Sequence, residues 1–74
     1  MAVRIELTAD EALVLFEFLS RYENSEALAI EHQAERRALQ NLLALLERQL
    51  VEPFRADYAD LLQRARERLR SSQT

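Results

Sequence analysis

The sequence contains no cysteine, no glycine, no tryptophan and no lysine, and it has a single proline and a single histidine among 74 residues. Without cysteine there is no disulfide, no thiolate metal site and no thiol nucleophile. Without glycine the chain has none of the glycine-rich loops that bind phosphate groups or dinucleotides. No apolar run has the length of a membrane span, and no signal-peptide pattern is visible at the N-terminus. We therefore expect a cytoplasmic protein that does not associate with membranes.

The composition is that of one small globular domain over residues 1–74, because 49% of the residues are hydrophobic and 31% are charged.

Charge is distributed unevenly along this domain. Residues 1–35 hold eight acids and two arginines, a net charge of −6, and residues 36–74 hold five acids and eight arginines, a net of +3. Such asymmetry can mark a partner surface or let the two halves attract each other, and we favour the second interpretation.

The first residues alternate between apolar and polar side chains, in the order Val3, Arg4, Ile5, Glu6, Leu7 and Thr8. A period of two predicts a half-buried β-strand over residues 3–7. A lone strand leaves its backbone N–H and C=O groups unpaired, and the sequence contains no second strand candidate. We therefore expect it to pair antiparallel with the same strand of a second copy about a two-fold axis. The alternative is an extended arm that lies on its own helices.

The rest of the sequence predicts three helices, over residues 9–22, about 26–50 and about 56–70. Thr8 and Glu11 form a capping box at the start of the first helix. The second helix carries a leucine stripe in its second half. Its first half is more polar, and the sequence leaves open whether the helix is broken near Ile30. Pro53 separates it from the third helix. The predicted fold class is mainly α, with a short N-terminal strand and three helices.

The apolar arcs of the first two helices are wider than one chain of this size can cover, which also favours a homodimer. The residues expected at the dimer interface are Val3, Ile5, Leu7, Val14 and Phe18.

Residues with catalytic or metal-binding chemistry are few. His32 lies beside Glu31 and Glu35 on a predicted helix, which resembles half of a carboxylate–histidine metal site. A second such set is absent, so we predict no metal and no cofactor. No serine has a histidine at a suggestive spacing, and Asp57 and Asp60 suit the start of a helix. We therefore expect no enzyme activity.

Four arginines near the C-terminus could contact phosphate groups: Arg64, Arg66, Arg68 and Arg70. The aromatic residues do not alternate with them, as they do where nucleic-acid bases stack. Since the protein is also acidic overall, we interpret these arginines as a solvated helix face and do not expect a nucleic-acid partner.

The opening segment 3–11, followed by an apolar helix, a polar turn and a second helix, resembles the ribbon-helix-helix repressors and antitoxins. This resemblance implies that two subunits pair their N-terminal strands and that alternate strand residues enter the DNA major groove. Carried over to this chain, the residues facing DNA are Arg4, Glu6 and Thr8.

A second resemblance covers more of the chain, at residues 10–17, 33–35, 50–54, 57–58 and 61–62. These segments look like a group of small bacterial proteins of unassigned function. The resemblance implies a bacterial protein of one domain and implies no activity.

The leading hypothesis is a small, non-enzymatic helical protein that acts by protein–protein interaction and self-association. An immunity- or antitoxin-type role is one form of it, because the acidic first half could cover a basic toxin surface. The alternative hypothesis is a DNA-binding regulator of the ribbon-helix-helix type.

Overall fold

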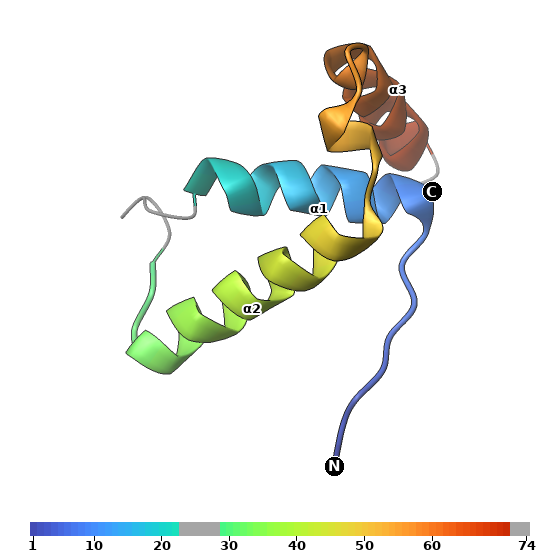
Figure 1. Ribbon diagram of the computed structural model, residues 1–74. Coiled ribbons are helices and arrows are strands. Elements are labelled where there is room, and N and C mark those ends of the chain that lie inside the picture. Colours follow the sequence, from blue (N-terminus) through green and yellow to red (C-terminus); the bar gives the residue numbers. More distant parts are fainter. Residues whose placement is uncertain (23–28, 72–74) are drawn as a thin grey trace.

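The computed structural model describes residues 1–22 and 29–71. Its elements are the helices α1 (Ala9–Tyr22), α2 (Gln33–Gln49) and α3 (Tyr58–Ser71), and the short 3₁₀ helix η1 (Glu52–Phe54). Helices α2 and α3 pack against α1 from different sides, and make no extensive contact with each other in the described residues. Residues 1–8, which we call the arm, leave the start of α1 as an extended trace (Figure 1). The predicted mainly helical fold is therefore confirmed.

The predicted strand over residues 3–7 is not present in the single chain. No β-strand occurs in residues 1–22 or 29–71, and no hydrogen bond joins the backbone of residues 1–7 to another described residue. The physical reason is that a strand needs a second strand, and the described chain offers none. The arm does not lie on the helices either, since Val3 and Ile5 are 83% and 75% exposed.

Helix α1 begins as the sequence predicts. The backbone N–H of Thr8 donates to Oε1 of Glu11 at 2.9 Å, and the N–H of Glu11 donates to Oγ1 of Thr8 at 3.1 Å. This reciprocal capping box supplies acceptors at the helix start, where no carbonyl of a preceding turn is available. The carboxylates of Asp10 and Glu11 lie in the first turn, where the helix dipole favours negative charge.

Helix α2 begins at Gln33. The predicted helix, with its start near residue 26, is therefore wrong over residues 29–32. Residues 29–32 are not helical, so the structure answers the question that the sequence left open near Ile30. Residues 26–28 of the predicted helix lie outside the described residues.

The late start of α2 is due to a capping box built on a histidine. Nδ1 of His32 accepts a hydrogen bond from the N–H of Ala34 at 2.9 Å. Oε1 of Glu35 accepts in return from the N–H groups of His32 at 3.3 Å and Glu31 at 2.8 Å. Histidine is not among the usual N-cap residues, which is why the sequence pattern did not reveal this start.

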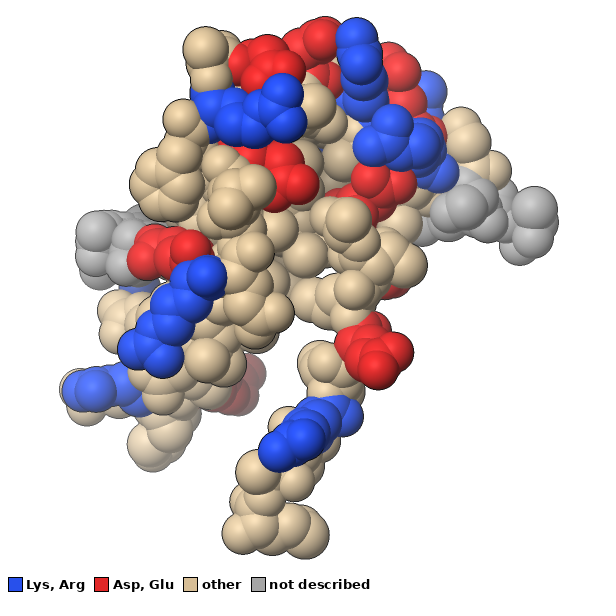
Figure 2. All heavy atoms as spheres, turned by 45° about the vertical axis from the view of Figure 1, so that its right-hand side comes forward, with Lys and Arg blue, Asp and Glu red and all other residues tan. Residues whose placement is uncertain are grey.

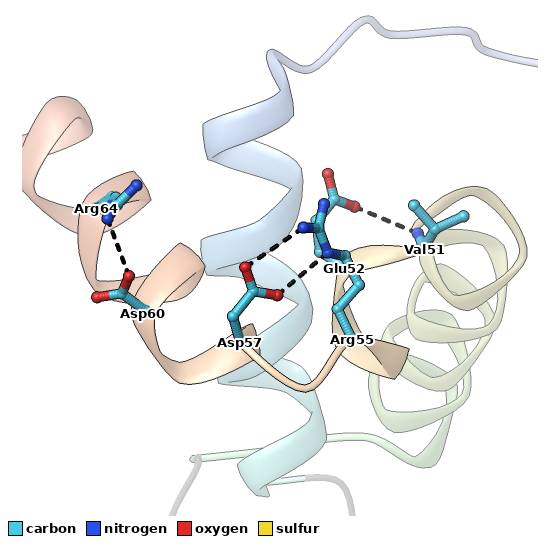
Figure 3. A network of polar contacts seen from close by, with 6 residues as sticks. All are labelled: Val51, Glu52, Arg55, Asp57, Asp60 and Arg64. Carbon is cyan, nitrogen blue, oxygen red and sulfur yellow. Dashed lines mark hydrogen bonds and ion pairs between the residues drawn. The ribbon is translucent and has the colours of Figure 1, made fainter.

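The connection from α2 to α3 is held by short-range polar contacts (Figure 3). The N–H of Val51 donates to Glu52 Oε1 at 3.2 Å, and the guanidinium of Arg55 donates twice to Asp57, at 3.1 and 3.3 Å. The carbonyl of Asp57 then accepts from the N–H of Leu61 at 3.0 Å, so α3 begins at Tyr58 and not at residue 56.

The core consists of two clusters, one on each side of α1. Between α1 and α3 lie Leu13, Leu62 and Ala65, and between α1 and α2 lie Leu19, Leu43 and Leu46. Leu50, the C-cap of α2, packs against both clusters. The apolar face predicted from the leucine stripe is therefore confirmed.

Two polar contacts attach α3 to α1. The hydroxyl of Tyr58 donates to Glu17 Oε1 at 2.9 Å, and the guanidinium of Arg68 donates to both oxygens of Asp10, at 2.8 and 2.9 Å. Because the start of α3 meets the later contact on α1, the two helices run antiparallel. Burial, together with the hydrogen bond to Glu17 and its charge, raises the pKa of Tyr58 to about 12. The hydrogen bond from Arg68 lowers the pKa of Asp10 below its usual value.

The histidine cap makes a first prediction. Replacing His32 by alanine removes the acceptor for the N–H of Ala34 and should lower the free energy of unfolding by about 1 kcal/mol, as loss of an N-cap typically does. His32→Asn keeps an acceptor at this position and should unfold at the same or a higher urea concentration than the wild type. Urea unfolding followed by circular dichroism measures both. Equal loss in the two variants would show that the cap is not what stabilises this helix start.

The contact between Tyr58 and Glu17 makes a second prediction. Tyr58→Phe removes one hydrogen bond and should lower the free energy of unfolding by about 1 kcal/mol near neutral pH. Since the pKa of tyrosine is about 10 in an unfolded chain and about 12 here, the raised pKa adds stability below pH 10 that is lost as the pH rises to 12. Urea unfolding of both proteins from pH 8 to 12 should show their difference shrink above pH 10. A difference that stays constant to pH 12 would contradict the assignment.

Candidate functional site

A groove of about 790 Å³ lies between the arm and the second half of α2, and we call it the arm groove. The large apolar residues of its lining are Val3, Ile5, Leu7, Leu42, Leu45, Leu46, Leu50 and Val51. Figure 2 shows charged side chains gathered at the end of the molecule formed by α3, whereas the surface between the helices and the arm is mostly uncharged. The arm groove is therefore an open and mostly apolar surface, and not an enclosed pocket for a small molecule.

The helical side of the groove is apolar because the apolar arc of α2 is wider than α1 can cover. Leu43 and Leu46 are buried against α1, but Leu45 lies to one side and remains 50% exposed. Val51, just after α2, is 68% exposed at the same groove. The sequence predicted an apolar arc on this helix that is wider than one chain can cover. It did not predict that Leu45 or Val51 would lie opposite the arm.

Three of the five residues predicted at a dimer interface line the arm groove: Val3, Ile5 and Leu7. The other two do not line it. Val14 packs against the core cluster between α1 and α3, and the ring of Phe18 lies 5.0 Å from that of Tyr22, centroid to centroid.

The arm also carries one charge of each sign within the groove lining, at Arg4 and Glu6. Neither side chain makes an ion pair or hydrogen bond within residues 1–22 and 29–71. Thr8, the other residue expected to face DNA, accepts from the N–H of Glu11 and so serves the start of α1.

The histidine cluster has a structural role. Nδ1 of His32 and the carboxylate of Glu35 both accept backbone hydrogen bonds at the start of α2. In the described ranges, no group of three or more histidines and carboxylates is placed to hold a metal ion. These atoms therefore cap a helix, a role that the sequence analysis did not assign to them.

The arginine series of α3 is partly used within the chain. Arg68 binds Asp10 of α1, and Arg64 lies 3.0 Å from Asp60 of its own helix. The pair between Arg68 and Asp10 joins the basic second half to the acidic first half, as the charge distribution led us to expect.

No protein-family model matches the chain, and neither a curated protein nor a solved structure is significantly similar to it. Among the described residues no helix is both long and apolar enough to cross a membrane. The arm and the arm groove are therefore the features from which we infer a function.

Proposed function

We propose that this protein is a non-enzymatic interaction module that associates with a second copy of itself through the arm and the arm groove. This proposal rests on the exposed apolar side chains of the arm, which lie across the groove from the exposed side chains of Leu45 and Val51. When apolar side chains stay exposed on a chain this small, a large part of the possible hydrophobic stabilisation is not realised. Association with a second copy would bury these side chains and provide that stabilisation.

The surface area of the chain supports association. The accessible surface is 6233 Å², whereas a folded monomer of 8.7 kDa is expected to expose about 4,700 Å². The arm contributes to this surplus, since Val3 and Ile5 are 83% and 75% exposed, and association would cover it. The radius of gyration, 13.4 Å, likewise exceeds the value of about 11 Å expected for a compact domain of this length.

The acidic first half of the chain does not carry the proposal. Asp10 binds Arg68 and Glu17 accepts from Tyr58, while Glu11 caps α1 and Glu35 caps α2, so four of its acids act within the chain. The proposal therefore depends on the apolar surface. An immunity- or antitoxin-type role stays a hypothesis about which other protein the self-associated form binds.

Substitution on the arm separates association from folding. Ile5 is 75% exposed, so Ile5→Asp should change the stability of the isolated chain by no more than about 0.5 kcal/mol. In the associated form it would bury an unpaired charge in each copy. We therefore expect the wild type to be dimeric and Ile5→Asp monomeric by multi-angle light scattering, with the melting temperature rising with concentration for the wild type only.

The matched control is Phe54→Asp, because Phe54 is 81% exposed and does not line the arm groove. This variant should remain a dimer. A wild type that stays monomeric at high concentration would refute the proposal, and dissociation by Phe54→Asp as readily as by Ile5→Asp would place the interface elsewhere.

A ribbon-helix-helix regulator would use the same arm to contact DNA, and we predict that this chain does not. Glu6 lies between Arg4 and Thr8 in the sequence, and its negative charge would repel the phosphate backbone of DNA. The hydroxyl oxygen of Thr8 already accepts a hydrogen bond from the N–H of Glu11. Selection from random DNA duplexes should return no preferred sequence. A palindromic motif whose binding weakens in Arg4→Ala would support the regulator in place of the interaction module.

A further inference from the structure

We propose that the arms of two copies pair antiparallel in one register, with Ile5 at the two-fold axis and Arg4 opposite the partner's Glu6. This inference rests on the self-association proposed above and specifies how it is achieved. The structure leaves the arm extended, with no backbone hydrogen bond from residues 1–7 to the described part of the chain. A second arm would pair those N–H and C=O groups, as every strand requires.

The charges select the register. With Ile5 opposite its own symmetry mate, Val3 faces the partner's Leu7, and Arg4 faces the partner's Glu6. The two-fold axis then creates this charge pair twice. Opposite charges on facing residues of two strands stabilise the pair, whereas like charges destabilise it.

Other registers lose this complementarity. Sliding one arm by two residues places Arg4 opposite the partner's Arg4 in one direction, and Glu6 opposite the partner's Glu6 in the other. A parallel pair in register also brings like charges together. Sliding by one residue sets apolar side chains opposite polar ones and mixes the two faces of the ribbon.

The selected register also gathers the apolar side chains. Val3, Ile5 and Leu7 of both arms then share one face of a two-stranded ribbon, since alternate residues of a strand point the same way. A two-stranded ribbon is stable in water only when one face packs against something else. The apolar wall of α2 at Leu45 lines the same groove as the arm and supplies that surface.

Charge-reversal variants test the register. Arg4→Glu and Glu6→Arg each replace two attractive contacts per dimer by two repulsive ones, and each should weaken the dimer about tenfold. The double variant Arg4→Glu/Glu6→Arg restores both contacts and should return the dissociation constant to within about threefold of the wild-type value. The readout is the dissociation constant from sedimentation equilibrium at low salt, where exposed charges are least screened.

Two controls match the change in net charge at exposed positions of α2 outside the arm groove. Arg37→Glu is matched to the first variant and Glu47→Arg to the second, and both should leave the dissociation constant unchanged.

Cysteine cross-linking gives a second measurement, because the natural chain has no cysteine. Ile5→Cys should form a disulfide-linked dimer on mild oxidation, since facing residues of paired strands have Cβ atoms about as close as a disulfide needs. Val3→Cys and Leu7→Cys should cross-link poorly alone and well when mixed with each other.

The outcomes separate this inference from the one on which it rests. If the wild type dimerises but charge reversal has no effect, or if Val3→Cys links to itself as readily as Ile5→Cys, the register is wrong and self-association stands. If the wild type is a monomer, both proposals fail together.

Discussion

The fold depends on α1, because α2 and α3 each pack against it and make no extensive contact with each other in the described residues. Leu13 on one side and Leu19 on the other are both 5% exposed, so α1 is covered on two sides while each outer helix is covered on one. One covered side is enough for α3, whose apolar face is narrow. It is not enough for α2, whose arc extends to Leu45, and the uncovered part of that arc becomes the wall of the arm groove.

The packing of α2 and α3 on different sides of α1 also explains where the charged side chains find partners. With only one apolar face, α3 is attached to α1 partly by polar contacts, from Tyr58 to Glu17 and from Arg68 to Asp10. A buried apolar strip flanked by such contacts fixes the direction of a helix as well as its position. The arm has no comparable contact, because Arg4 and Glu6 find no partner within the described residues. Arg4 and Glu6 carry opposite charges two residues apart, which is the pattern that lets a strand pair antiparallel with a copy of itself.

Much of the fold was predictable because it depends on local patterns. The capping box of Thr8 and Glu11, the leucine stripe of α2 and the break at Pro53 are short-range signals, and the structure has all three. The start of α2 was not predictable in this way, since it uses His32 as its cap. The strand was predicted from alternation alone, which cannot show whether a partner strand exists in the same chain. Three groove residues were found from this alternation, whereas Leu45 and Val51 depend on how α2 is oriented on α1, which no short-range pattern specifies.

In the proposed function, the arm and the arm groove hold two copies together. Sedimentation equilibrium of the wild-type protein over a wide range of concentrations tests it most directly. We expect a mass that rises with concentration from 8.7 kDa to twice that value and no further. A mass that stays at that of one chain at every concentration would contradict it.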